Sequence, residues 1–281
     1  MVNVTRALWR CLEAVHGMIY FAPEAEKRYA EAGLDRASGY FASRAAALGP
    51  VSAEIVIATF YNFNPERVRA AIPAAWEKAS PEQMLGMRLD SVDDALNRGL
   101  ADFIGTDHMK EAAGIARKAA ERATEMLHGR TLFAAHATLP WPTEPHLELW
   151  HAQTLLREFR GDGHLAALLI EGVSGLEALV IHAGSGEVPA ESLRKTRGWS
   201  TEDWDATVED LQKRGLLNED RTLSEQGLGL RQRIEDHTDA MAAAAYDTLR
   251  DDERARLIEL GTPLTMSIMA AGMIPGGRKL S

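Results

Sequence analysis

The sequence has little cysteine, no long hydrophobic run and none of the common catalytic motifs. Cys11 is the single cysteine among 281 residues, so an internal disulfide cannot form, and this favours a reducing compartment. The start of the chain lacks the apolar core of a secretory signal peptide. No stretch approaches the roughly eighteen apolar residues of a membrane-spanning helix. We therefore expect a cytoplasmic protein that does not enter a membrane.

The missing motifs exclude most well-marked enzyme classes. Walker, GxGxxG, GxSxG, HExxH and CxxC patterns do not occur in the sequence. Nothing else in the sequence identifies a cofactor, so the cofactor stays unknown.

The composition is that of an ordinary globular protein, with 46% hydrophobic and 26% charged residues. The net charge of −10 at pH 7 gives a field that repels nucleic acid in bulk, although a local basic patch can still bind DNA.

Hydrophobic spacing predicts helix along nearly the whole chain. An apolar stripe at helical spacing opens the sequence and consists of Leu8, Leu12, Val15 and Ile19. Asn64-Pro65-Glu66 and Ser80-Pro81-Glu82 each have the capping residue, proline and acid of a helix start. The segment AEIVIATFY fits either a strand or a buried helix. Three prolines in ATLPWPTEPH (137–146) mark the clearest break in the chain.

Residues 165–241 have the layout of a winged helix. We predict one helix over 165–184, a short helix over 189–198, and a third that Ser200 caps and Gly215 ends. LLNEDRTLS (216–224) then predicts two short strands around a tight turn, and Ser224 begins a long helix. The phrase LQKRGLL…RTLSEQG resembles the MarR-type regulators, where a similar run joins recognition helix, wing and following helix.

The predicted fold is therefore all-α with a small β-wing. We expect a helical domain at 1–140, a winged-helix domain at 147–250 that includes the RGDGH helix, and a C-terminal helical tail at 251–281. The amphipathic part of the tail, 257–274, either packs back on the core or pairs in a homodimer.

The predicted third helix is a poor surface for DNA. Over 199–217 five acidic residues stand against two basic ones, Lys213 and Arg214. Bringing these carboxylates to a phosphate backbone costs free energy through repulsion and desolvation. A small basic cluster, Arg194, Lys195 and Arg197, lies nearby and is able to touch phosphates. DNA binding is disfavoured by the acidic helix and stays open.

A dense polar segment interrupts apolar helix in LLREFRGDGHLAALL (155–169). It fits a buried salt-bridge network that ties two halves together, a polar pocket, or a solvated turn. In a pocket, Arg160 would hold an anion, His164 would move a proton or bind a ligand atom, and Asp162 would orient that histidine. The candidate catalytic residues are His164, Asp162 and Glu158. The candidate ligand-binding residues are Arg157, Arg160, His151, His16 and Tyr20.

Two Glu-x-x-His pairs, Glu13 with His16 and Glu148 with His151, carry the spacing of dinuclear carboxylate sites in ferritin-like bundles. The motif is only two residues long and the two supporting glutamates cannot be identified. We therefore expect no metal site, and expect His16 to pack near Tyr20. A separate aromatic set fits either a pocket or a plain core: Tyr40, Phe41, Phe60, Tyr61 and Phe63.

The whole chain resembles an actinobacterial group of SalK-like helix-turn-helix proteins. The phrases that carry the resemblance are HGMIYFAPEA, FYNFNPERVRAAIPAAW, LWHAQTLLREFRGDGHLAAL and RGWSTEDW. The resemblance implies a winged helix and supplies no site residues.

Three functions follow as hypotheses. The first is a small-molecule-binding winged-helix protein, with or without catalysis, whose polar pocket lies at the junction of the two domains. The second is a MarR-like transcriptional regulator whose helical half senses a ligand. The third is a non-catalytic interaction protein with a degenerate winged helix.

Overall fold

The computed structural model describes residues 4–275, and these residues form helices joined by turns, without a β-strand. The α-helices are α1 (Val4–Gly17), α2 (Pro23–Glu31), α3 (Arg36–Ala45), α4 (Ala53–Thr59), α5 (Pro65–Ala71), α6 (Ala75–Lys78), α7 (Pro81–Gly99), α8 (Asp107–Ala123), α9 (Thr131–His136), α10 (Pro145–Ile170), α11 (Gly175–Gly184), α12 (Ala190–Arg197), α13 (Thr201–Lys213), α14 (Glu225–Ala243) and α15 (Asp251–Ala270). Short 3-10 helices are η1 (Met18–Tyr20), η2 (Ala46–Leu48) and η3 (Ala244–Tyr246). The all-α prediction is confirmed.

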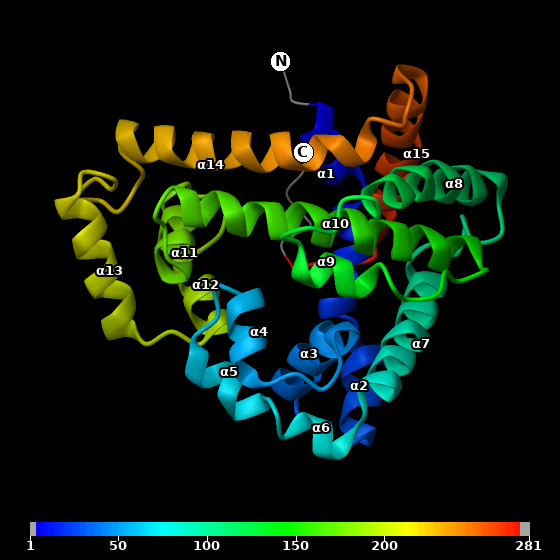
Figure 1. Cartoon of the computed structure of the whole chain (residues 1–281), viewed down its shortest axis with the longest axis horizontal. Helices are drawn as coiled ribbons and strands as arrows, with labels where there is room; N and C mark the ends of the chain where they lie inside the picture. The colour runs from blue at the N-terminus through cyan, green and yellow to red at the C-terminus, as the bar shows by residue number, and fades with distance from the viewer. Residues whose placement is uncertain (1–3, 276–281) are drawn as a thin grey trace.

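Helix α10 crosses the middle of the molecule, and α14 runs alongside it (Figure 1). We call α11–α13 the three-helix unit and α1–α9 the N-terminal helices. The three-helix unit lies at one end of α10, α7 and α8 lie at the other, and α2–α6 lie below α10 in the view of Figure 1.

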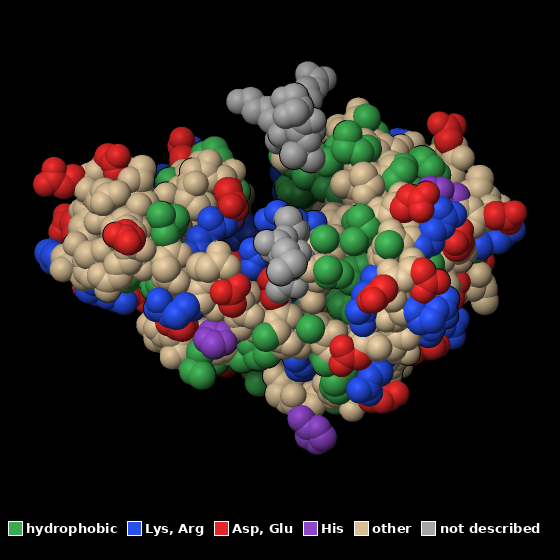
Figure 2. All heavy atoms as spheres, turned by 90° about the horizontal axis from the view of Figure 1, so that it is seen from above, with side chains coloured by type: hydrophobic (Ala, Val, Ile, Leu, Met, Phe, Trp, Pro, Cys, Tyr) green, Lys and Arg blue, Asp and Glu red, His purple; other side chains and the backbone are tan. Residues whose placement is uncertain are grey.

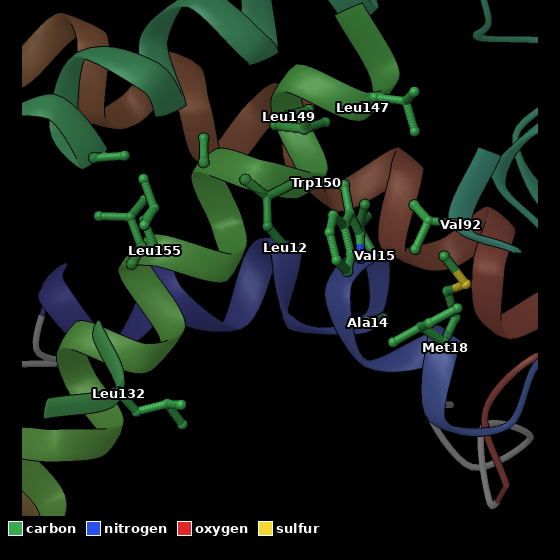
Figure 3. Close-up of a cluster of buried hydrophobic side chains, with 14 of the residues drawn as sticks. Leu12, Ala14, Val15, Met18, Val92, Leu132, Leu147, Leu149, Trp150 and Leu155 are labelled. Carbon is green, nitrogen blue, oxygen red and sulfur yellow. The ribbon is translucent and has the colours of Figure 1, made fainter. Parts of the chain in front are cut away.

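The larger hydrophobic cluster anchors α1. Leu12 and Val15 of α1 are fully buried, and α1 packs against α10 and α15. Trp150 and Leu155 of α10 belong to the same cluster (Figure 3). Complete burial of such a side chain contributes about 1.5–3 kcal/mol. The apolar stripe predicted at the start of the sequence is thus confirmed as a core face.

A second, smaller cluster holds the three-helix unit together. Trp204, Val208 and Leu211 form the buried face of α13, at the spacing that the sequence predicts. Leu193 of α12 and Leu179 of α11 pack in the same cluster. The exposed side of α13 is left to its charged residues.

One unbroken helix contributes to both clusters. Phe159 of α10 lies in the first cluster and Leu168 in the second. With 26 residues, α10 is about 39 Å long at the α-helical rise. The glycines of the polar segment do not interrupt it. Gly163 instead permits close packing, because a Cβ there would lie 3.3 Å from Met241 Cβ of α14.

The predicted helix over 165–184 is wrong. The chain turns a corner after α10, where Gly172 has a φ of +66°. Ser174 then begins α11 with a capping box to Glu177, and the two helices meet at 97°. The apolar residues continue on both sides of the corner, so hydrophobic spacing alone does not show it.

The predicted β-wing is also wrong. Between α13 and α14 the chain forms a turn with one isolated antiparallel bridge, between Leu217 and Leu223. Gly215 ends α13 with a φ of +73° and Ser224 caps α14. Between them the Asn218 N–H donates to the Thr222 carbonyl over 2.9 Å, but the Leu223 N–H donates to the Gly184 carbonyl of α11 over 3.0 Å, so the bridge does not extend into a ladder. The winged-helix classification fails, whereas the helical part of the prediction holds.

The predicted helix starts are confirmed by their caps. Asn64 and Ser80 accept backbone N–H groups at the starts of α5 and α7, and Ser200 and Ser224 do so at α13 and α14. Each cap satisfies an N–H group that lacks a partner inside its helix. The ambiguous segment AEIVIATFY forms helix α4.

The C-terminal helix packs back on the larger cluster. Leu257, Leu264 and Ile268 of α15 are buried, and α15 contacts α1 and α8. The division into 1–140, 147–250 and 251–281 stays a prediction, and residues 276–281 of the tail lie outside the described residues.

Within residues 4–275 no single helix has the length and apolar character needed to cross a membrane. Two strongly bent helix pairs, Arg36–Leu48 with Ala53–Thr59 and Pro145–Ile170 with Gly175–Gly184, meet the length and composition criteria only when taken together.

Candidate functional site

A cavity of about 1020 Å³ lies between the N-terminal helices and the three-helix unit. Residues of α1, α3, α10, α11, α12 and α14 line it, together with the turn before α5. Seen from above, the molecule has a notch between two lobes where Lys and Arg side chains gather (Figure 2). The volume reaches the upper end of the range of small-molecule sites, about 300–1,000 Å³.

Aromatic rings form one wall of the cavity. The ring centroids of Tyr40 and Phe63 lie 5.6 Å apart, those of Phe41 and Phe63 4.9 Å, and those of Tyr20 and Tyr40 5.5 Å. Phe60 lines the same wall. The aromatic set that the sequence left open between pocket and core thus borders the cavity.

Two arginines lie over aromatic rings of this wall. Arg44 of α3 places its guanidinium carbon 4.3 Å from the ring centroid of Phe60 and donates to the Tyr40 hydroxyl over 3.0 Å. Arg197, at the end of α12, lies 4.8 Å from the ring centroid of Phe63. The Nε atoms of both arginines are buried and have no hydrogen-bond partner among the described residues.

The candidates Arg157 and Glu158 form part of a buried ion-pair network. Arg157 contacts Glu158 and Glu13, each over 3.1 Å, and Arg44 lies 3.6 Å from Glu158. Burial by itself would raise the pKa of Glu158, but the Arg44 and Arg157 guanidiniums lower it to about 2. Glu158 is therefore a fixed negative charge at neutral pH. A group with so low a pKa is a poor general base.

The candidate Arg160 is held by carboxylates of α14. It contacts Asp239 over 2.5 Å and Glu235 over 3.0 Å. Asp239 is fully buried and also binds Arg6 of α1 over 2.7 Å. Paired in this way, Arg160 joins α10 to α14, and its charge is compensated before any ligand arrives.

The structure gives His164 and Asp162 different partners. His164 Nδ1 lies 3.0 Å from the Thr238 hydroxyl of α14, and burial lowers its pKa. Asp162 instead accepts the Phe133 N–H over 2.9 Å at the start of α9. Burial raises the pKa of Asp162 to about 6, although that hydrogen bond acts in the opposite direction. Thr238, and not Asp162, is thus the side chain that orients His164.

Of the remaining candidates, His16 and Tyr20 contact each other, whereas His151 has other partners. His16 is buried between the Thr154 hydroxyl (3.0 Å) and the Tyr20 hydroxyl (2.9 Å), and only Tyr20 of these borders the cavity. His151 packs edge-on against Trp141, with ring centroids 4.7 Å apart. Burial lowers the pKa of His151 to about 4, which keeps its imidazole neutral at pH 7.

The two Glu-x-x-His pairs have other partners. Glu13 contacts Arg157 and Glu148 contacts Arg117 over 2.9 Å. His16 and His151 are engaged as described above. In the part of the chain that the structure describes, no group of three or more His, Cys, Asp or Glu side chains is placed to hold a metal ion.

The sequence did not single out Arg44, Arg197 or Thr238 as pocket residues. Arg197 stood in a basic cluster assigned to phosphate contacts, yet it turns toward the cavity. A signal was present for Arg44, which follows Tyr40 and Phe41 on the same helix. An arginine on the apolar side of an aromatic helix indicates a buried cation.

A family model described as a helix-turn-helix family matches residues 5–275. Comparison with curated proteins and with solved structures gives no match.

Proposed function

Because the chain belongs to this helix-turn-helix family, we propose that it binds a small molecule in the cavity between its N-terminal helices and its three-helix unit. Family membership alone does not give this function, so the proposal depends on the site.

The cavity is the observation that carries the proposal. It has the volume of a small-molecule site, an aromatic wall and a few convergent polar groups, the combination that marks ligand sites. Its two sides belong to different hydrophobic clusters. Backbone and side-chain bonds close the junction: Asn64 N–H donates to the Arg197 carbonyl over 2.9 Å, and Trp199 Nε1–H donates to the Asn62 carbonyl over 3.0 Å.

A neutral fluorescent probe tests the proposal independently of ligand charge. N-phenyl-1-naphthylamine gains fluorescence in apolar sites, and we expect one saturable site per chain. Ala178→Trp places a large side chain on the cavity wall and should abolish this signal. Ala206→Trp, on the exposed face of α13, is the matched control and should retain it. Absence of saturable binding, or equal binding by both variants, would contradict the proposal.

His164 is the candidate catalytic residue of the cavity. It lines the cavity as a neutral imidazole positioned by Thr238, the state that a general base requires. Glu158 and Asp162 are bound to arginines and to a helix terminus, respectively, so we assign them to structure. His164→Ala should then weaken ligand binding and leave the unfolding temperature nearly unchanged.

The family match favours a second candidate, a ligand-responsive DNA-binding regulator. The charges of α13 argue against tight binding, because the nearby cations are already paired with acids. Lys213 lies 3.9 Å from Glu209, and Arg221 lies 3.1 Å from Asp205. Arg214 contacts Glu177. DNA phosphates would have to displace these carboxylates from the Lys and Arg side chains. This displacement costs part of the free energy that counterion release contributes to DNA binding.

Fluorescence anisotropy with the DNA upstream of the protein's own coding sequence separates the two candidates. Under our first proposal, any DNA binding is weak and the same for a scrambled duplex. Sequence-selective binding that falls steeply with salt and requires Lys213 and Arg221 would establish the regulator.

A further inference from the structure

The cavity wall carries an excess of positive charge in a negatively charged protein. Among the described residues, nine Lys and Arg and six Asp and Glu line it, whereas the whole chain has a net charge of −10. Three of these cations, Arg44, Arg157 and Arg197, lie over aromatic rings of the wall. Cations in such a place attract a counter-charge more strongly than cations in water.

Arg197 is one of the cavity cations that have no carboxylate partner among the described residues. Its Nη1 donates to the Thr196 hydroxyl over 3.1 Å. Its buried Nε has no hydrogen-bond partner, and no described Asp or Glu lies within salt-bridge distance of it. Burial lowers the pKa of Arg197, and the neighbouring guanidiniums of Arg44 and Arg157 act in the same direction. A buried N–H donor without an acceptor is costly, and native proteins rarely retain one without a reason.

Arg44 presents a second donor without an acceptor. One of its Nη atoms binds the Tyr40 hydroxyl and the other lies 3.6 Å from Glu158, but its Nε is orphaned. The side chain of Arg44 is only 12% exposed, so water reaches it poorly. Arg44 and Arg197 both act on Tyr40: burial would raise the pKa of that phenol, and the two guanidiniums lower it. The two arginines therefore border the same space.

We infer that the ligand of this cavity is a small molecule with an oxyanion group, a carboxylate or a phosphate, that the guanidinium groups of Arg44 and Arg197 bind. Guanidinium groups bind such oxyanions with charge-assisted hydrogen bonds. The apolar body of the ligand lies against Phe60 and Phe63. This inference rests on the proposed function and specifies the chemistry of its ligand.

The anion would join two parts of the molecule. Arg44 belongs to α3 of the N-terminal helices, and Arg197 ends α12 of the three-helix unit. The Arg197 backbone is fixed by Asn64, so an oxyanion between the two side chains tightens the junction without moving that backbone. Bound anion therefore stabilises the contact between the parts.

Matched probes of equal shape and different charge test the inference. Benzoate, benzamide and benzamidine share one ring and carry negative, zero and positive charge, and phenyl phosphate distinguishes a phosphate site from a carboxylate site. Fragments of this size reach a Kd of about 1 mM in a good site. We expect benzoate or phenyl phosphate to bind in isothermal titration and to raise the unfolding temperature, and benzamidine to do neither. Failure of both anions to bind, or tighter binding of benzamidine, would overturn the inference.

Charge removal at single positions locates the anion. Arg197→Gln should weaken binding of the anionic probe about 10- to 100-fold, the loss of one charge-assisted hydrogen bond. It leaves no described carboxylate unpaired, so the fold should persist. Arg44→Gln should give a similar loss, with Glu158 still paired to Arg157. Arg69→Gln, on α5 and outside the cavity lining, removes the same charge and should leave the Kd unchanged.

The outcomes separate this inference from the proposed function. If N-phenyl-1-naphthylamine binds and Ala178→Trp blocks it, while the Arg197 and Arg44 variants bind the anions as the parent does, the cavity is a ligand site and the oxyanion assignment is wrong. If the neutral probe also fails, the proposed function itself is wrong.

Discussion

Asp162 makes the stability of this protein depend on pH in a direction unusual for a carboxylate. Its side chain accepts the Phe133 N–H, yet burial raises its pKa from 3.8 to about 6. Between these two pH values the folded protein keeps a proton that the unfolded chain releases. The contribution of Asp162 to stability is therefore complete below about pH 4 and is lost as the pH rises through 6.

The magnitude follows from the two pKa values. From 3.8 to about 6 is about two pH units, and at about 1.36 kcal/mol per unit this amounts to about 3 kcal/mol. The side chain is only 9% exposed, so solvent screens it little.

Asp162→Asn isolates this contribution, because the amide does not ionise and its oxygen can still accept the Phe133 N–H. Urea unfolding should be measured over a pH range of about 4 to 7. We expect the variant to gain about 3 kcal/mol relative to the parent across that range. Buried histidines titrate equally in both proteins and cancel from the difference. Asp236→Asn, on the exposed face of α14, should show a constant difference.

A difference between Asp162→Asn and the parent that does not change with pH would refute the reasoning. Such a result would mean that the pKa of Asp162 is not raised in the folded protein and that its carboxyl is not buried as described.

Two further changes test the packing of the junction. Asp239→Ala leaves Arg160 and Arg6 without their shared buried carboxylate, and the free energy of unfolding in urea should fall by about 3–5 kcal/mol. Gly175→Ala places a Cβ 2.0 Å from the Tyr61 carbonyl oxygen and should lower the unfolding temperature, with a loss of about 1–3 kcal/mol. Gly114→Ala, in open space on α8, should instead stabilise the helix by about 0.5–1 kcal/mol, as circular dichroism would show.

The control for the first change is Asp252→Ala, an exposed position at the start of α15 whose loss should be small. Equal effects of Asp239→Ala and Asp252→Ala would show that the buried network contributes little. An equal response of the two glycine variants would show that α11 does not approach Tyr61 so closely.

The features of the fold that depend on residues close together in the sequence were predictable. Asn64 and Ser80 cap helices because each donor lies two or three positions away, and the apolar face of α13 follows from helical spacing alone. The corner between α10 and α11 was missed because the apolar residues continue past it. The wing was predicted wrongly because a turn signal does not reveal which backbone groups pair, and the Leu223 N–H donates to α11 instead.

The site depended on contacts between distant parts of the chain. The density of charge at 155–169 indicated a buried network, but its partners lie far away: Asp239 is 79 positions from Arg160. The orientation of Arg197 is set by the docking of α12 beside α5, which no local pattern encodes. For the same reason Thr238 could not be identified as the partner of His164.

The continuity of α10 limits how this molecule can move. The same helix packs in both hydrophobic clusters. The two lobes therefore cannot separate by a bend in the middle of α10 unless backbone hydrogen bonds of that helix break, which is costly in a packed core. The available pivot is the corner at 171–174, where Gly172 adopts a left-handed conformation. A tilt of α11–α13 relative to α10 therefore has to turn about that corner.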